Sequence, residues 1–515
     1  MKAILKAPVD LLFFGGIGTY VRASNERDDA AGDRANDAIR LTGGDLKCKV
    51  IGEGANLGMT QRGVRLNTDA IDNSAGVNTS DVEVNIKIAL SGPVRAGKLT
   101  MEARNALLAQ MTDEVAHLVL RNNYQQTLAI SLAQRRGLED LGFQQRLMQT
   151  LEVRGELDRG VEFLPDEVAI AERRKRNAGL TRPELAVLLA YAKLSLYSEL
   201  LDSPVPDDPY LGRELERYFP KEMSKRYSDA LHAHRLRREI IATQLTNSMI
   251  NRGGATLIVR IADQTGAASP AISAAFAAVR NSYEMIELNS QIDALDNKIS
   301  GKVQLDLYGA VQDLLLDRLV WFLRNVDLTQ GLEKIIGHYR EGIAQVAGAL
   351  DGALSKSAAG ARDARVTELV KAGVSDALAY RMGSLSVLKA APDIALVADR
   401  AGKPVAEVAA TYFATEAFFQ LDRVTNAVPN IVVSDYFDRL ALDRALDSIG
   451  DAERRLTAAM VGNGHAGAGA VEEWVRPRQA EVERIRSAIH EIAGSGMTLS
   501  KLSVAASLLG DLAKD

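Results

Sequence analysis

The residues best suited to ligand chemistry lie in the first hundred positions, where short apolar runs end in small and polar side chains. One apolar run is followed by Gly15-Gly16, and a second runs into Glu53-Gly54-Ala55-Asn56. A third segment ends in Asn73-Ser74-Ala75-Gly76. Strands that end in glycine and asparagine present their backbone to a ligand at the carboxyl edge of an open α/β sheet. The pattern therefore predicts a ligand-binding edge of such a sheet.

The groups at this edge are suited to holding a ligand rather than to transferring a proton. The backbone at Gly15, Gly16 and Gly54 would form a cradle beside the amide side chains of Asn56 and Asn73. Amide groups donate and accept hydrogen bonds at the same time, so they match hydroxyl and carboxamide groups of a ligand. The sequence shows no acid and base pair in a recognisable catalytic arrangement.

Two features of this region also have purely structural explanations. We expect Ser80 to start a helix, because it forms a Ser-x-x-Glu capping box with Glu83. A helix start favours carboxylates, so Ser80 could bind a ligand carboxylate, with Val77 shaping the pocket, or it could only cap the helix. The Gly15-Gly16-Ile17-Gly18 run lacks the third glycine of a dinucleotide-binding fingerprint and could form only a tight turn.

Several runs in a fixed order along the chain point to one enzyme family. Besides Glu53–Asn56 and the segment from Asn73 through Val77 and Ser80 to Glu83, they are Ala7–Leu12, Phe14–Tyr20, Gly32–Asp37, Asn67–Asn73, Leu180–Ala186 and Asn251–Gly254. Together these runs resemble the end of the nucleotide-binding domain, and the helical region behind it, of the large bacterial NAD-specific glutamate dehydrogenases. The resemblance covers most of the chain and thins after about Leu350.

The resemblance implies a cofactor, a substrate and the positions that bind them. The cofactor would be NAD, and the complete enzyme would oxidise L-glutamate to 2-oxoglutarate and ammonia. The positions expected at the cofactor are Gly15, Gly16, Glu53, Gly54, Asn56 and Asn73. Val77 and Ser80 are expected at the substrate. The catalytic lysines, the aspartate and the pyrophosphate loop of the family lie upstream of the segment that matches Met1, so this chain alone should be inactive.

Composition and hydrophobic periodicity predict a mostly helical protein. The chain has 515 residues, is 47% hydrophobic and changes from strand-like to helical spacing of apolar residues near Thr100. We therefore expect a partial α/β, Rossmann-like region at residues 1–99, a helical domain at 100–350 and a C-terminal helical bundle at 351–515. All or nearly all strands should lie in the first region.

Local sequence patterns predict three further features. Residues 8–14 and 47–52 should form buried strands, which would place Cys48 in the core. Residues 351–363 are rich in Gly, Ala and Ser and should form a linker or a frayed helix end. Thr181 and Glu184 form a second capping box, which predicts a helix over 181–201.

Charge and cysteine content narrow the range of partners. The net charge of -5 argues against a dedicated nucleic-acid binder, and one cysteine excludes a disulfide framework and a cysteine-based zinc cluster. The chain has neither a signal peptide nor an apolar run long enough for a bilayer, which favours a cytoplasmic protein without a membrane or metal partner. The resemblance adds the upstream catalytic region and further copies in a homo-oligomer. A non-catalytic helical oligomerisation or regulatory module is the alternative.

Overall fold

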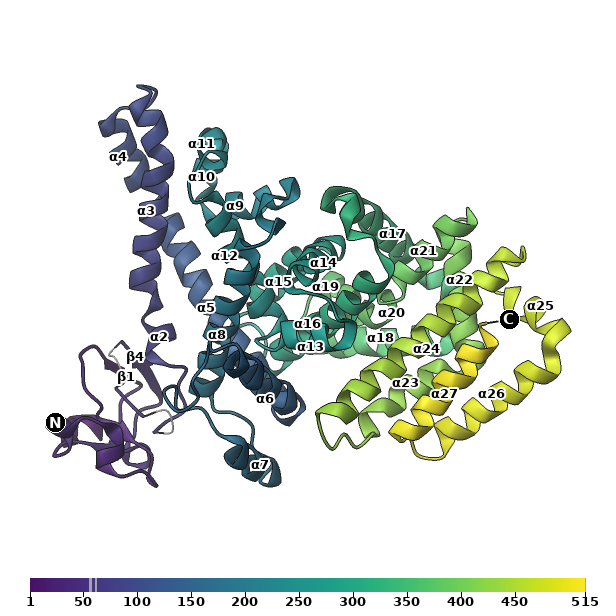
Figure 1. Ribbon diagram of the computed structural model, residues 1–515, viewed down its shortest axis with the longest axis horizontal. Helices are drawn as coiled ribbons and strands as arrows, with labels where there is room; N and C mark the ends of the chain where they lie inside the picture. The colour runs from purple at the N-terminus through teal and green to yellow at the C-terminus, as the bar shows by residue number, and fades with distance from the viewer. Residues whose placement is uncertain (55–57, 61–62, 515) are drawn as a thin grey trace. The chain divides into compact units, whose positions relative to one another are not determined.

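The computed structural model describes residues 1–54, 58–60 and 63–514 (Figure 1). The chain divides into two compact units. The first unit comprises Met1–Ala262 with Ala268–Ser273, and the second comprises Asp263–Ala267 with Ala274–Asp515. Among the described residues every strand lies between Leu11 and Glu53, and regular structure after residue 100 is helical. The predictions of a mostly helical chain and of strands confined to residues 1–99 are thus confirmed.

The helices account for most of both units. Those of the first unit are α1 (Lys2–Leu5), α2 (Asp69–Asp72), α3 (Ser74–Arg95), α4 (Met101–Gln110), α5 (Thr112–Arg136), α6 (Leu138–Val153), α7 (Glu167–Lys175), α8 (Arg182–Leu201), α9 (Gly212–Tyr218), α10 (Lys221–Arg226), α11 (Ser228–His232) and α12 (Arg237–Gly253). Both units contribute residues to α13 (Leu257–Thr265) and α14 (Ser269–Ser282). The second unit continues with α15 (Met285–Asp293), α16 (Gly301–Asn325), α17 (Leu332–Ala353), α18 (Lys356–Lys371), α19 (Asp376–Gly383), α20 (Leu385–Leu388), α21 (Ala391–Ala401), α22 (Val405–Phe419), α23 (Leu421–Ala427), α24 (Tyr436–Gly462), α25 (Ala470–Val475), α26 (Gln479–Gly494) and α27 (Leu499–Leu512).

Two short parallel strand pairs form the start of the first unit. Strand β1 (Leu11–Phe14) pairs with β4 (Val50–Glu53), and β2 (Val21–Arg22) pairs with β3 (Leu41–Thr42). They enclose a small core whose buried members are Leu5, Phe14, Val21, Leu41, Met59 and Leu66. The two predicted strands are therefore present, each shorter than expected. The prediction that they are buried is wrong, because only Phe14 and Glu53 at their ends are buried and Leu11, Phe13 and Val50 are exposed.

Cys48 does not lie in a buried strand, and that prediction is wrong. β4 begins at Val50, so Cys48 precedes it in irregular backbone and is half-buried. Lys47 and Lys49 flank the cysteine and are both exposed. Two charged neighbours keep this segment at the surface, because ammonium groups are costly to bury.

The start of α3 also differs from the prediction. α3 buries Val82, Ile86, Ala89 and Leu90, the face that their helical spacing predicts. It begins at Ser74, however, so Ser80 lies inside the helix and is not its N-cap. The side chain of Asn123 on α5 donates to Ser74 Oγ at 3.1 Å, and α3 and α5 run side by side (Figure 1). This tertiary contact favours the earlier start over the local capping pattern.

The capping box at Thr181 and Glu184 is confirmed, and it opens α8. The Glu184 side chain accepts a hydrogen bond from the Thr181 backbone N–H at 2.7 Å. It also accepts a hydrogen bond from each of the two terminal guanidinium nitrogens of Arg173, at 2.6 and 2.7 Å. One buried carboxylate thus accepts a hydrogen bond from the backbone N–H at the N-terminus of α8 and links this helix to α7 through Arg173.

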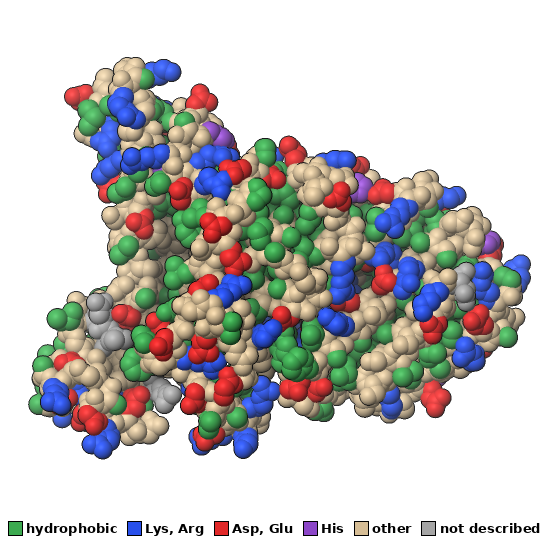
Figure 2. Space-filling model, in the orientation of Figure 1, with side chains coloured by type: hydrophobic (Ala, Val, Ile, Leu, Met, Phe, Trp, Pro, Cys, Tyr) green, Lys and Arg blue, Asp and Glu red, His purple; other side chains and the backbone are tan. Residues whose placement is uncertain are grey.

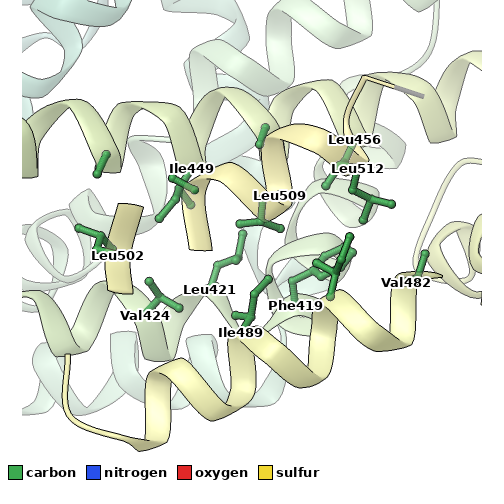
Figure 3. Close-up of a cluster of buried hydrophobic side chains, with 14 of the residues drawn as sticks. Phe419, Leu421, Val424, Ile449, Leu456, Val482, Ile489, Leu502, Leu509 and Leu512 are labelled. Carbon is green, nitrogen blue, oxygen red and sulfur yellow. The ribbon is translucent and has the colours of Figure 1, made fainter. Parts of the chain in front are cut away.

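The second unit has its own apolar core, shown in Figure 3. The labelled side chains come from the end of α22 and from α23, α24, α26 and α27: Phe419, Leu421, Val424, Ile449, Leu456, Val482, Ile489, Leu502, Leu509 and Leu512. Residues 351–363 do not form a linker, because α18 begins at Lys356 with Ser355 as its cap. Alanine, which is common in this stretch, is the strongest helix former, and this outweighs the glycines there.

The surface is that of solvated helices. The face in Figure 2 carries Lys and Arg side chains intermingled with Asp and Glu side chains. Within the described ranges we find no helix whose length and hydrophobicity would carry it through a bilayer.

Candidate functional site

The ends of β1 and β4 meet at one edge of their sheet. The parallel register pairs Phe14 with Glu53, and the backbone N–H of Gly54 donates to the carbonyl oxygen of Phe14 at 2.8 Å. Gly15 and Gly16 therefore leave the sheet beside Gly54, and both are exposed. The structure thus brings these three glycines together. Asn56, expected beside them, lies outside the described residues.

The surroundings of Gly54 and Gly16 at this edge differ. A Cβ atom at Gly54 would lie 2.6 Å from Phe13 Cζ and 3.1 Å from the Phe14 carbonyl oxygen, so a side chain there would displace the Phe13 ring and crowd the backbone of β1. A Cβ atom at Gly16 would meet nothing within 4 Å. The backbone after β1 is thus open to approach from outside, as a nucleotide contact would need.

Glu53 faces the protein interior. Its side chain is buried, with the residue only 1% exposed, and Oε1 accepts a hydrogen bond from the Met59 backbone N–H at 3.1 Å. Burial, aided by the nearby carboxylates of Asp69 and Asp72 and opposed by the backbone N–H groups of Met59 and Gly58, raises the pKa of Glu53 to about 7. Glu53 therefore holds the turn that follows β4, and its carboxyl group does not face the exposed edge.

We expect Glu53→Gln to remove a pH dependence of stability. Between the ordinary pKa of 4.5 and about 7, folded Glu53 keeps a proton that the unfolded chain has released, so the stability of the native chain falls as pH rises. Glutamine has no such proton, and the variant should gain roughly 2 kcal/mol relative to the native chain by about pH 8. Urea unfolding from about pH 5 to pH 8 measures this difference. Glu102→Gln, on the exposed surface of α4, is the control, and equal slopes for Glu53→Gln and the native chain would contradict the assignment.

Asn73, Val77 and Ser80 form one exposed stripe along α3. Their spacing of four and three residues places them on the same helix face, opposite the buried face, and Val77 is 70% exposed. The stripe starts beside the sheet edge, because α2, which directly precedes Asn73, packs against β4. Ser80 lies about 9 Å along the helix axis from Ser74, so the argument that it binds an anion at the helix start does not apply.

Arg182 was missed by the sequence reasoning, although it fixes the segment before α3. Its guanidinium donates to Asn67 Oδ1 at 2.5 Å, to Ser131 Oγ at 3.1 Å and to Gln134 Oε1 at 3.2 Å. Asn67 in turn donates to Asp72 Oδ1 at 2.9 Å. These contacts tie the segment that leads into α3 to α5 and α8. The runs around Asn67 and Arg182 were both conspicuous in the sequence, but nothing local indicated that they touch.

The chemistry available at this edge is hydrogen bonding to a ligand. Exposed backbone at Gly15 and Gly16 and the exposed amide of Asn73 fit the hydroxyl and amide groups of a nucleotide. The hydroxyl of Ser80 can donate to an oxygen of a second ligand farther along α3. Within the described residues no group of three or more His, Cys, Asp and Glu side chains is placed to hold a metal ion.

The described residues thus combine a glycine-lined edge of short parallel strands with a large helical body, which is the class of a mostly helical protein with a small α/β region at its start. Comparison with known protein families identifies the family to which the chain belongs. Residues 177–511 match the family "Glutamate dehydrogenase, C-terminal", and residues 1–133 match "Bacterial NAD-glutamate dehydrogenase, catalytic domain". The chain belongs to the family of bacterial NAD-specific glutamate dehydrogenases, which confirms the resemblance in its sequence.

Individual relatives match over the whole chain. It is 40% identical over 527 residues to the NAD-specific glutamate dehydrogenase of Pseudomonas aeruginosa and 39% identical over 526 residues to that of Halomonas elongata. It is 36% identical over 524 residues to that of Mycobacterium tuberculosis. These alignments cover 98–100% of this chain but 32% of each relative, so the chain spans about a third of the length of the curated relatives it matches.

Proposed function

We propose that the chain is the carboxyl-terminal portion of an NAD-specific glutamate dehydrogenase. The complete enzyme oxidises L-glutamate to 2-oxoglutarate and ammonia, and NAD, when bound, accepts the hydride. The main support within this structure is the parallel register that brings Gly15, Gly16 and Gly54 to one sheet edge, with α3 starting close by. Family membership supplies the identity of the reaction.

In this proposal the described residues bind and orient, and they do not transfer protons. The backbone at Gly15, Gly16 and Gly54 and the amides of Asn56 and Asn73 contact NAD. Glu53 contributes by holding the turn after β4, since its Oε1 is bonded to the Met59 N–H. Val77 and Ser80 contact the side-chain end of glutamate from the exposed stripe of α3. The reactive lysines and aspartate come from the upstream catalytic region.

We also infer that β1 and β4 belong to a larger Rossmann-like sheet. Leu11 and Phe13 on β1 and Val50 on β4 are 57%, 63% and 59% exposed. Parallel sheets are normally covered on both faces, so three exposed apolar side chains on one strand pair call for a covering layer. The upstream part of the longer enzyme would provide that layer and further strands.

The remaining proposals concern organisation of the whole enzyme. We propose a division of this chain at about residues 99 and 350, assembly into a homo-oligomer and a location in the cytoplasm. The matched relatives are about three times as long as this chain, which supports a covalent connection to the upstream region.

The 515-residue chain by itself should show no glutamate-dependent reduction of NAD, because the proton-transfer groups lie upstream. The complete polypeptide, which joins the upstream region to this chain, should restore turnover. NADH absorbance measures both reactions. Turnover by the chain alone would mean that the catalytic residues are misassigned. An inactive but folded complete polypeptide would favour the alternative, a non-catalytic oligomerisation or regulatory module.

A further inference from the structure

The second unit contains a cavity that the proposed function does not use. Its volume is about 1140 Å³, and its lining comes mainly from α16, α22, α24 and α27, together with the segment that leads into α21. All residues proposed above for NAD and glutamate belong to the first unit, so this cavity is a separate site. Its lining combines acidic and basic side chains in equal measure, which is unusual for a cavity that only reflects imperfect packing.

Part of this charge is compensated within the protein. Asp393 is 4% exposed and accepts a hydrogen bond from Trp321 Nε1 at 2.6 Å. Arg454 Nη1 lies 3.3 Å from Asp393 Oδ1, and Arg318 Nη1 lies 3.6 Å from Asp393 Oδ2. Asp393 therefore serves as the shared counter-charge of two arginines and needs no ligand.

Two buried side chains in the lining each keep one atom without a hydrogen bond, although Arg318 donates to Asp317 Oδ2 through Nε at 3.0 Å and through Nη2 at 2.7 Å. Glu453 is 7% exposed, and within the described residues its Oε1 has no hydrogen-bond partner. Arg318 is 8% exposed, and its Nη1 likewise makes no hydrogen bond there, since 3.6 Å to Asp393 is too long for one. Buried polar atoms in folded proteins are nearly always bonded, so one unmet acceptor and one unmet donor in the same cavity indicate a missing partner.

The charged residues around Glu453 and Arg318 indicate which charges a bound ligand would carry. Burial raises the pKa of Glu453 well above its ordinary value, the carboxylate of Glu416 adds to the effect, and Lys389 opposes it. Burial also raises the pKa of Glu416, again against Lys389. A bound cation beside the two glutamates would relieve their repulsion. Lys389 lies exposed in the same lining and also lowers the pKa of Asp317, the carboxylate bonded to Arg318, so its charge also acts at the Arg318 end, where it can attract a bound anion.

We propose that this cavity binds a small dipolar ligand that carries one ammonium and one carboxylate group, the class to which free amino acids belong. The ammonium group donates to Glu453 Oε1 beside Glu416. The carboxylate accepts from Arg318 Nη1 and interacts with Lys389. A purely cationic or purely anionic ligand satisfies only one of the two unmet groups and leaves the other buried without a partner.

Isothermal titration calorimetry of the 515-residue chain tests this proposal with defined probes. The dipolar probes are glycine, γ-aminobutyrate and ε-aminocaproate, which separate the same two charges by increasing lengths. Methylammonium and acetate each carry only one of the charges. At least one dipolar probe should bind about tenfold or more tightly than both single-charge probes. Binding of methylammonium alone, of acetate alone, or of no probe would overturn the proposal.

Two variants locate the binding. Glu453→Gln removes the ammonium partner, and Lys389→Met removes a cation at an exposed position, where folding should be little affected. Each should weaken the dipolar probe by about tenfold or more. Glu341→Gln on α17 is the control, because Glu341 is exposed and accepts a hydrogen bond from Gln345 one turn along the same helix. If Glu453→Gln does not fold, Lys389→Met decides alone. Unchanged affinity in Lys389→Met would place any binding elsewhere and overturn the assignment.

Discussion

Replacing Glu184 by Gln is expected to destabilise the first unit by about 3 kcal/mol. The residue is 1% exposed. Its carboxylate accepts hydrogen bonds from two guanidinium nitrogens of Arg173 and from the backbone N–H of Thr181. Loss of its charge leaves Arg173 half-buried without a carboxylate. Breaking a buried pair in this way typically costs about 3–5 kcal/mol. We expect the lower end because the Arg173 side chain keeps 16% exposure and can reach water.

The pH dependence of this pair provides an independent check. Burial alone would raise the pKa of Glu184, but hydrogen bonds from Arg173 and Thr181 outweigh it and hold the pKa below its ordinary value of 4.5. Its contribution is therefore present above that value and lost as the pH falls below it. Glu184→Gln should lose this dependence, so native and variant stabilities should converge in acid.

A double-mutant cycle that combines Glu184→Gln with Arg173→Met measures the interaction energy between these two side chains. Urea unfolding of the single and double variants should give a coupling energy, with the double variant more stable than the sum of the single effects predicts. Glu172→Gln on the same helix is the matched control. Its ion pair with Arg176 is exposed and 3.9 Å long, so the change should cost less than about 0.5 kcal/mol. A similarly small effect for Glu184→Gln would refute the importance of the buried pair.

The sequence predicted well those features that depend on local patterns. The change of hydrophobic spacing near Thr100 separated the strands from the helices, and helical spacing identified the buried face of α3. The capping box at Thr181 was confirmed because Glu184 is held there by Arg173 as well as by the backbone. Agreement between local and tertiary preferences makes such a boundary predictable.

The errors arose where a distant contact or a residue's neighbours decided the structure. Ser80 has the local pattern of a helix cap, but Asn123, far along the chain, contacts Ser74 and is associated with the earlier start of α3. The bond between Arg182 and Asn67 spans 115 residues, and no spacing rule indicates it. The unmet atoms of Glu453 and Arg318 become visible only when four helices are packed together. The glycines at the sheet edge could be predicted because strand ends are local, but the side-chain direction of Glu53 could not.

Ser80→Ala in the complete enzyme should lower kcat/KM for glutamate by about ten- to a hundredfold. If the Ser80 hydroxyl donates to the substrate carboxylate, its removal loses a charge-assisted hydrogen bond worth roughly 1.5–3 kcal/mol in the transition state. The affinity for NAD should barely change, because the proposed cofactor contacts lie at the sheet edge and at Asn73. Steady-state kinetics with glutamate and with NAD as the varied substrate distinguish the two effects.

The position of Ser80 makes this test cleaner than a helix cap would allow. Loss of a serine cap costs about 0.5–2 kcal/mol of stability, which would confuse a loss of folding with a loss of binding. Ser80 instead lies exposed within α3, where alanine is the better helix former, so the variant should be at least as stable as the native enzyme. Ser91→Ala, near the other end of α3, is the control and should leave both kinetic constants unchanged. A folded Ser80→Ala enzyme with full catalytic efficiency would leave Val77 as the only proposed substrate contact in this chain.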